Sequence, residues 1–277
     1  MKNAPALTIS VVFYKTPVVH INKLLASLCH IKPPFHIYFV DNSPTDFLRS
    51  FCVPHFSFEY IHLPSNPGFG SAHNLAIRLS RSAGSNYHLV INADVSFSYD
   101  VISAMLDYMN KHSEVGHMMP KVLNMDGSVQ RLCKLVPTPM DLLVRRFMPA
   151  RLKKARDRIF EMHDSGYDKI MFAPYLSGCF MLFRQQALLD IGVFDERFFM
   201  YPEDIDLTRR IALKYDTIFF PKVQVYHEHG AASYKSFRML VIHSFNIIKY
   251  FNKWGWFYDP VRSKLNEKAI SQFSMFG

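Results

Sequence analysis

Leu7–Tyr14 reads LTISVVFY, and this short run decides the fold class of the chain. It is apolar on both faces and rich in β-branched residues, which is the pattern of a strand buried inside a parallel sheet. Val18–Leu28 follows, with valine and leucine at near-helical spacing, and Pro33 and Pro34 close that segment. A buried strand followed by a helix predicts the first unit of an α/β fold.

The same alternation continues through the first hundred residues and predicts a parallel, doubly wound sheet. In such sheets ligands bind beyond the carboxyl ends of the strands, where Asp41, the Asn66–Gly70 loop and Asp94 fall. The further elements expected here are strands at His36–Val40, Phe58–Leu63 and Tyr87–Asn92, and helices at about Ser71–Ser82 and Tyr99–Lys111.

The second half of the chain is less regular, but it contains no internal repeat and no low-complexity linker. We therefore expect a single domain over residues 1–277, with a mostly parallel central sheet flanked by helices. The elements expected in this half are strands at Tyr175–Phe183, Thr217–Phe220 and Val223–Tyr226, a short helix from Gln185–Leu189, an exposed basic helical insertion within Pro137–Gly166, and an amphipathic helix at Ser236–Tyr258.

Composition limits the class of protein without choosing a partner. The 277 residues are 49% hydrophobic, which excludes global disorder. The formal net charge of +9 suits an anionic partner: nucleic acid, a nucleotide substrate or an anionic membrane surface. The four cysteines show no CxxC spacing, which argues against a zinc ribbon or a disulfide framework. With neither a signal peptide nor an apolar run of about 18 residues in view, we expect a cytoplasmic protein with peripheral membrane contact.

Gly192–Arg209 reads GVFDERFFMYPEDIDLTR and places Glu203, Asp204 and Asp206 directly behind an aromatic, apolar run. Unpaired carboxylates are costly to bury, so this arrangement suits a cation site or proton transfer. The alternative is a helix N-terminus after Pro202, where acidic residues complement the helix dipole. Taken alone, the segment favours the helix cap.

A loop rich in glycine and asparagine, Ser65–Asn74, separates a predicted strand from a predicted helix. Its two glycines, Gly68 and Gly70, let the backbone approach a ligand, and a helix N-terminus favours phosphate. The loop is neither a P-loop nor a GxGxxG motif. An ordinary tight turn is an equal alternative.

Two short segments carry candidate metal ligands. Asp94 ends Asn92-Ala93-Asp94, where it either caps a helix or binds a divalent cation together with substrate phosphates. His227-Glu228-His229 has too few histidines for a structural zinc site, and histidines that are packed or face solvent are the commoner outcome. Either His227 or His229 could complete a metal shell begun by Asp94.

The basic run Arg145–Arg158 suits contact with nucleic acid, although a solvated helix face is the commoner outcome. No DNA- or RNA-binding signature accompanies it, so we expect no nucleic-acid partner. Together with Ser236–Tyr258 it is a candidate for peripheral membrane contact or for binding an acceptor diphosphate. A surface helix and a core-packing helix are the alternatives.

Seven segments, taken in order, resemble the family 2 glycosyltransferases of bacterial polysaccharide assembly, especially the rhamnosyltransferase-like branch. The resemblance covers residues 7 to about 260, and each motif is modest evidence alone. The segments are ISVVFY, VDNS, NPGFGSAHN, INADV, YLSGCFMLFR, IGVFDERFFMYPEDIDLTRR and VYHEHGAAS.

This resemblance implies a GT-A fold and an enzyme that inverts the anomeric centre. It divides the domain into a nucleotide-sugar half (about 1–100), an acceptor and catalytic half (about 101–233) and a C-terminal amphipathic helical segment (about 234–277). It implies that Asp41 contacts the nucleobase, that Asn66, Gly68, Phe69 and Asn74 belong to the loop along the nucleotide sugar, that Asp94 and His227 meet the metal, and that Asp204 is the catalytic base. Tyr14 and Phe69 are candidate surfaces around the base or the sugar.

The family's DxD-type metal motif is Asn92-Ala93-Asp94 here, so only one of its carboxylates remains. A divalent cation, Mg2+ or Mn2+, is still the expected cofactor, and the extra His229 leaves the second ligand open between the two histidines. Inverting sugar transfer needs one base for the acceptor proton and a positive centre for the departing diphosphate. Glu203 and Asp204 are adjacent and point in different directions, which argues against the carboxylate pair of a sugar-cleaving enzyme.

The sequence therefore predicts an inverting glycosyltransferase that acts on a lipid-linked glycan at the inner face of a bacterial membrane. dTDP-rhamnose is the expected donor, and a UDP-hexose is the next choice. A nucleotidyltransferase is disfavoured because Lys15-Thr16-Pro17 is a poor match for the glycine-rich basic loop that such enzymes carry after the first strand. A non-catalytic glycan-binding module is disfavoured by the intact Glu203-Asp204 pair.

Overall fold

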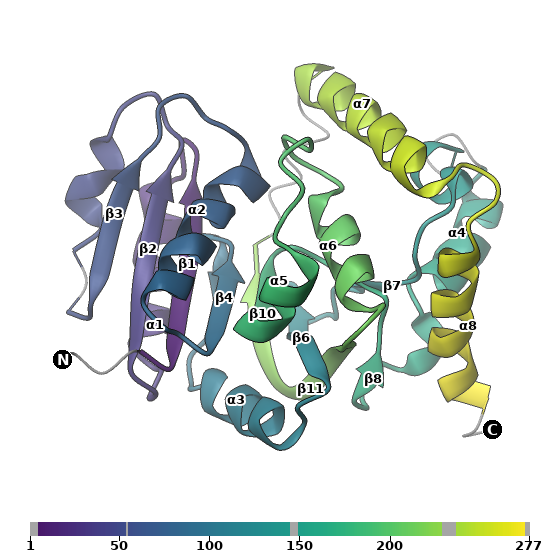
Figure 1. The fold of residues 1–277 in the computed structure, drawn as a ribbon, viewed down its shortest axis with the longest axis horizontal. Coiled ribbons are helices and arrows are strands. Elements are labelled where there is room, and N and C mark those ends of the chain that lie inside the picture. Colours follow the sequence, from purple (N-terminus) through teal and green to yellow (C-terminus); the bar gives the residue numbers. More distant parts are fainter. Residues whose placement is uncertain (1–4, 54, 145–148, 229–236, 275–277) are drawn as a thin grey trace.

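The computed structural model describes residues 5–53, 55–144, 149–228 and 237–274, and in them one mixed sheet of nine strands runs through the molecule, flanked by helices (Figure 1). The path through the sheet is β3-β2-β1-β4-β10-β6-β11-β5, with β8 paired to β11. The strands are β1 (Leu7–Phe13), β2 (Phe35–Asp41), β3 (Phe58–His62), β4 (Tyr87–Ile91), β5 (Val95–Ser96), β6 (Val115–Leu123), β8 (Met171–Phe172), β10 (Phe180–Arg184) and β11 (Asp216–His227); β7 (Cys133–Lys134) and β9 (Tyr175–Leu176) form a second, two-stranded sheet.

The first half of the sheet confirms the predicted parallel arrangement. Strands β3, β2, β1 and β4 are parallel neighbours, and Leu7, Ile9, Val11 and Phe13 of β1 are fully buried. The predicted first helix is confirmed as α1 (Val18–Leu28). The next helix, α2 (Phe69–Ser82), begins two residues earlier than predicted, so its first turn contains Phe69 and Gly70.

The second half contains two departures from the predicted strands. Tyr175–Phe183 is not one strand, because β9 pairs with β7 while β10 joins the main sheet antiparallel to β4 and β6. A turn at Gly178 and Cys179 separates β9 from β10. The two strands predicted at Thr217–Phe220 and Val223–Tyr226 are one strand, β11, with a register shift between Phe220 and Gln224.

Local hydrogen bonds account for where the third helix begins. Asp100 accepts the N–H groups of Ile102 and Ser103 through one carboxylate oxygen, so α3 (Ile102–Lys111) begins after Asp100 and not at Tyr99. The remaining helices are α4 (Ala150–Phe160), α5 (Gln185–Ile191), α6 (Glu203–Ile211), α7 (Phe237–Trp254) and α8 (Pro260–Ser274), with shorter helical turns η1 (Phe47–Phe51), η2 (Met140–Val144) and η4 (His163–Ser165).

The helical C-terminal segment is two helices. The predicted amphipathic helix is α7, which ends at Trp254, and α8 follows it after Pro260. Helix α7 lies across the top of the molecule in Figure 1, above α6 and at the end of the sheet opposite α3. None of the helices in the described ranges is both long enough and apolar enough to cross a bilayer.

Candidate active site

Asp204 lies in the first turn of α6, and its carboxylate is held by three groups. Oδ2 accepts the backbone N–H of Gly178 at 3.0 Å and lies 3.5 Å from the Tyr175 hydroxyl, while Oδ1 accepts the N–H of Ile205 at 2.8 Å. Burial raises the pKa of Asp204, and the two backbone N–H donors and the charge of Lys134 oppose that rise. Asp204 is therefore a fixed carboxylate with enhanced basicity, as a general base requires.

The structure separates the roles of the three acids in this turn. Asp206 faces α7, where it accepts from Lys253 Nζ at 2.6 Å and Trp254 Nε1 at 2.8 Å. Glu203 is buried, and burial, followed by the charge of Asp204, raises the pKa of Glu203 well above its usual value. The three acids of this turn therefore lie in three different environments, and Asp204 is the one held by Gly178 and Ile205. The helix-cap interpretation and the catalytic one are thus compatible.

The turn at Gly178 and Cys179 contacts both the Asp204 carboxylate and the segment that contains Asp94. The carbonyl of Cys179 accepts the N–H of Asn92, which begins the Asn92-Ala93-Asp94 segment. Burial raises the pKa of the Cys179 thiol, and the charges of Asp94 and Asp204 raise it further. Both carboxylates therefore lie near the same turn, although they come from distant parts of the chain.

Asp94 and His227 meet at the edge of the sheet where β5 pairs with the end of β11. His227 Nε2 lies 3.3 Å from Asp94 Oδ1, and the Asp94 carbonyl accepts the N–H of Glu228 at 2.9 Å. The other ring nitrogen of His227 lies 2.9 Å from Gln130 Oε1, and the Gln130 amide donates to the His227 carbonyl at 2.7 Å. Gln130 therefore fixes the ring with Nε2 toward Asp94.

These two residues fit a divalent cation in the chemistry of their donors. The Asp94 side chain is 27% exposed, so its oxygens remain accessible, whereas the His227 side chain is 7% exposed and oriented by its neighbour. A cation such as Mg2+ is usually bound through one or two carboxylates plus substrate phosphates. In the part of the chain that the structure describes, no group of three His, Cys, Asp or Glu side chains could hold a metal by itself. His229 lies outside the described residues.

The Asn66–Gly70 segment contacts the aromatic run that leads to Asp204. Gly68 has φ +104°, and a Cβ at this position would lie 2.3 Å from the Phe199 carbonyl oxygen. That oxygen also accepts the N–H of Phe69 at 3.0 Å. Asn66 likewise has a positive φ, of 46°. The backbone at Gly68 therefore approaches the Phe199 backbone at a distance that only glycine permits.

Asn74 lies deeper, on the buried side of α2. Its amide donates to the Phe194 carbonyl at 2.9 Å and accepts the Phe194 N–H at 3.0 Å. A third bond, at 2.9 Å, joins it to Glu196. These contacts give Asn74 a structural role in joining α2 to the segment before α6, and its place on the nucleotide sugar stays a prediction.

Asp41 and Tyr14 lie at the carboxyl ends of adjacent strands. Asp41 is fully buried, and its carboxylate accepts the Tyr60 hydroxyl and the N–H of Ser43. Burial and this hydrogen bond raise the pKa of Tyr60. Tyr14 follows β1 and is 50% exposed, so its ring offers an accessible surface at this edge. Asn42 donates to the Gly68 carbonyl at 3.3 Å and joins this edge to the glycine loop.

Three contributors to this site were not predicted from the sequence: Gln130, Gly178 and Lys134. Gly178 carried a recognisable signal, because a glycine inside a strand pattern indicates a bulge or a close approach.

The predicted basic run is only partly described, since Arg145 and Arg146 lie outside the described residues. Within α4, Arg156 pairs with Asp141.

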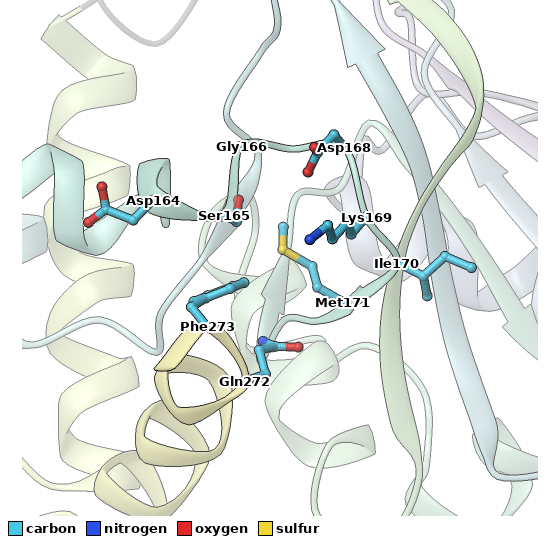
Figure 2. Close-up of a pocket in the computed structure, with 9 residues that line it drawn as sticks. All are labelled: Asp164, Ser165, Gly166, Asp168, Lys169, Ile170, Met171, Gln272 and Phe273. Carbon is cyan, nitrogen blue, oxygen red and sulfur yellow. The ribbon is translucent and has the colours of Figure 1, made fainter. Parts of the chain in front are cut away.

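A separate hollow of about 350 Å³, away from all the predicted site residues, lies where α8 contacts the segment after η4 (Figure 2). Gln272 there accepts the N–H of Phe172 at 3.0 Å and donates to the Phe172 carbonyl at 2.8 Å. These bonds hold α8 against β8, so we assign the hollow to helix packing.

The chain is similar in sequence to known rhamnosyltransferases. It is 29% identical over 235 residues to N-acetylglucosaminyl-diphospho-decaprenol L-rhamnosyltransferase of Mycobacterium tuberculosis (strain ATCC 25618 / H37Rv), with 79% of this chain and 74% of that protein covered. It is 26% identical over 235 residues to rhamnosyltransferase WbbL of Escherichia coli (strain K12), with 79% of this chain and 84% of that protein covered.

The fold has solved counterparts. A crystal structure of GalNAc-T7 with UDP, GalNAc and Mn2+ matches with a TM-score of 0.58 at 12% identity, covering 83% of this chain and 45% of that one. The chain thus spans less than half of that protein, and the likeness confirms the GT-A fold alone. The family model for glycosyl transferase family 2 matches residues 8–192, well over half of the chain. The chain therefore belongs to glycosyl transferase family 2 and is a glycosyltransferase.

Proposed function

We propose that this enzyme transfers L-rhamnose from dTDP-rhamnose to a lipid-linked saccharide, with inversion at the anomeric carbon. The names of the two relatives support rhamnose as the sugar, and the decaprenol in one of those names supports a polyprenyl diphosphate carrier. One observation carries the catalytic part of the proposal. It is the turn at Gly178 and Cys179: the N–H of Gly178 binds the carboxylate of Asp204, and the carbonyl of Cys179 binds the N–H of Asn92, two residues before Asp94.

In this proposal Asp204 removes the proton from the acceptor hydroxyl as its oxygen attacks the anomeric carbon. The bond from that carbon to the diphosphate breaks, and its electron pair leaves with the nucleoside diphosphate. The N–H groups of Gly178 and Ile205 fix the carboxylate, so little reorganisation accompanies proton transfer. Burial raises the pKa of Asp204, which makes the carboxylate a stronger base.

Asp94 and His227 are the proposed ligands of a divalent cation. When bound, the cation neutralises negative charge on the departing diphosphate. Gln130 orients His227, and outer contacts of this kind preserve both ring orientation and ligand basicity. The cation is proposed as Mg2+ or Mn2+.

Residues at the carboxyl ends of the first strands are the proposed contacts of the nucleotide-sugar donor. Tyr14 offers an exposed ring for the base, and the first turn of α2 offers backbone N–H groups to phosphate. The carboxylate of Asp41 is itself buried, so Asp41 is proposed to position Tyr60 beside the nucleobase through their hydrogen bond. The ring of Phe69 packs edge-on against His73 and is held in place for the sugar.

The test is a transfer assay with a polyprenyl-diphosphate-linked N-acetylglucosamine acceptor and a panel of donors. dTDP-rhamnose is expected to give product of inverted anomeric configuration, detected by NMR, together with free dTDP. Transfer from a UDP-hexose and none from dTDP-rhamnose would overturn the proposed donor. Transfer with retained configuration would overturn the single-base mechanism.

A further inference from the structure

The outward face of α7 is apolar where a surface helix is normally polar. Val241, Phe245 and Ile248 lie one to two helical turns apart, and their side chains are 36%, 61% and 41% exposed. The opposite face is apolar too, because Ile247, Tyr250 and Phe251 are buried against the domain. A helix that is apolar on both faces needs a second apolar environment outside the molecule.

The charge of this segment is of one sign. No acidic residue occurs between Glu228 and Asp259, whereas four cations do: Lys235, Arg238, Lys249 and Lys253. Arg197, Lys249, Asn252 and Lys253 line a surface hollow beside the helix. Asp195 pairs with Arg197 and Lys253, and Asp206 also pairs with Lys253, so the three cations there exceed the two acids by one charge. Cations next to an exposed apolar stripe are complementary to an anionic lipid surface.

Helix α7 also supports the backbone that leads to the candidate base. Asn246 donates to the Met200 carbonyl at 3.0 Å, and Lys249 donates to the Arg197 carbonyl at 3.0 Å. The rings of His243 and Tyr201 meet edge-on at 5.3 Å. The segment Arg197–Tyr201, which α7 contacts, touches Gly68 through Phe199 and leads directly to Asp204. A surface that binds α7 is therefore separated from both site residues by this one segment.

We propose that the outward face of α7 is a docking surface for an anionic lipid bilayer, and that docking places the candidate active site where a lipid-linked acceptor is available. The inference rests on the proposed function for its acceptor. A bilayer is favoured over a second copy of this chain, because pairing two such faces would bring cationic segments together. Figure 1 shows α7 on the same side of the molecule as the carboxyl ends of β1 and β2.

The test is flotation with vesicles of phosphatidylglycerol and phosphatidylcholine, using the double variant Phe245→Ser, Ile248→Ser. Loss of two partly inserted apolar side chains is expected to weaken vesicle binding about 10- to 100-fold. Leu213→Ser is the matched control, because Leu213 is 53% exposed but lies just before β11, at the other end of the sheet. Its binding should equal that of the wild type, and wild-type binding should fall at high salt and on pure phosphatidylcholine.

Two further measurements distinguish a loss of membrane binding from misfolding of the variant and from dimerisation. Calorimetric titration with dTDP should give the same affinity for the double variant and the wild type, which establishes that the variant is folded. Analytical ultracentrifugation should find the wild type monomeric at the concentrations used. A wild type that does not bind anionic vesicles, a double variant that binds as well as the wild type, or a dimer abolished by the double substitution would each overturn the proposal. None of these readouts depends on transfer activity, so a failure of the proposed donor would be seen separately.

Discussion

His227 Nε2 lies 3.3 Å from Asp94 Oδ1, although the two residues belong to opposite halves of the chain. The pairing of β5 with the end of β11 produces this contact, since Val95 is opposite His227 in the antiparallel register. A short bridge of two strand residues thus assembles the candidate cation site from two motifs that are separate in sequence.

Substitution of either residue should remove cation-dependent donor binding. Asp94→Asn and His227→Ala are expected to lose the increase in dTDP affinity that Mg2+ or Mn2+ gives the wild type, as measured by calorimetric titration. Gln130→Ala should lose part of that increase, because a residue that orients a ligand typically contributes 10- to 100-fold in metal affinity. His112→Ala, on a half-exposed surface histidine, is the control. An unchanged metal effect in Asp94→Asn would refute the assignment.

Gly68→Ala should disrupt the contact between the glycine loop and the aromatic run. The added Cβ would lie 2.3 Å from the Phe199 carbonyl oxygen, so one backbone segment must move. We expect a loss of roughly 2–4 kcal/mol in unfolding free energy, measured in urea, with weaker dTDP binding. Gly127→Ala measures the cost of a positive φ without a clash, because Gly127 also has a positive φ but nothing lies within 4 Å of its added Cβ. Equal losses in the two variants would show that the clash with Phe199 is unimportant.

The acid limb of the pH–rate profile should report Asp204. Asp204 must be ionised to accept a proton, and burial raises its pKa, so kcat/KM should fall with decreasing pH at a higher pH than the value near 4 of an exposed aspartate. The charge of Lys134 lowers the pKa of Asp204, so Lys134→Met should move the limb to still higher pH. Lys214→Met removes an exposed lysine that pairs with Asp190, and it should leave the limb in place. A limb unmoved in Lys134→Met would count against Asp204 as the titrating group.

The ion pair of Arg209 and Asp259 should matter more to stability than any exposed pair. Both side chains are almost completely buried, and the Arg209 guanidinium lies 3.8 Å from the centre of the Trp254 ring. Asp259→Ala leaves a buried cation without its partner, with an expected cost of about 3–5 kcal/mol in unfolding free energy. Asp216→Ala, which removes the partner of the exposed Lys268, should cost at most about 1 kcal/mol. Comparable losses in urea unfolding would contradict the greater contribution of the buried pair to stability.

Elements with a strong local pattern were predicted well. Val18–Leu28 combines helical spacing with closing prolines, and the structure has the same bounds. The buried strand at Leu7 and its parallel neighbours needed only the run of apolar residues and the alternation with helices. The meeting of Asp94 with His227 was predicted through a family resemblance, because no local pattern relates residues so far apart.

Tertiary contacts account for what the sequence did not predict. Tyr175–Phe183 was predicted as one strand although Gly178 interrupts its pattern, and in the structure the chain turns at Gly178, whose N–H binds Asp204. Gln130 and Lys134 act on His227 and Asp204 across the fold, so neither has a sequence signal of its own. Helix α8 is held by Gln272 and Asn266, whose partners lie far back in the chain.

The most direct test of the account is the transfer rate of Asp204→Asn with the true donor and acceptor. The amide keeps the size of the side chain and loses the base, so kcat should fall about 10²- to 10⁴-fold while the affinity for dTDP stays at the wild-type value. Glu203→Gln, which alters the adjacent buried acid, should retain most of the activity. A variant Asp204→Asn that transfers sugar at the wild-type rate would contradict the central claim that Asp204 is the catalytic base.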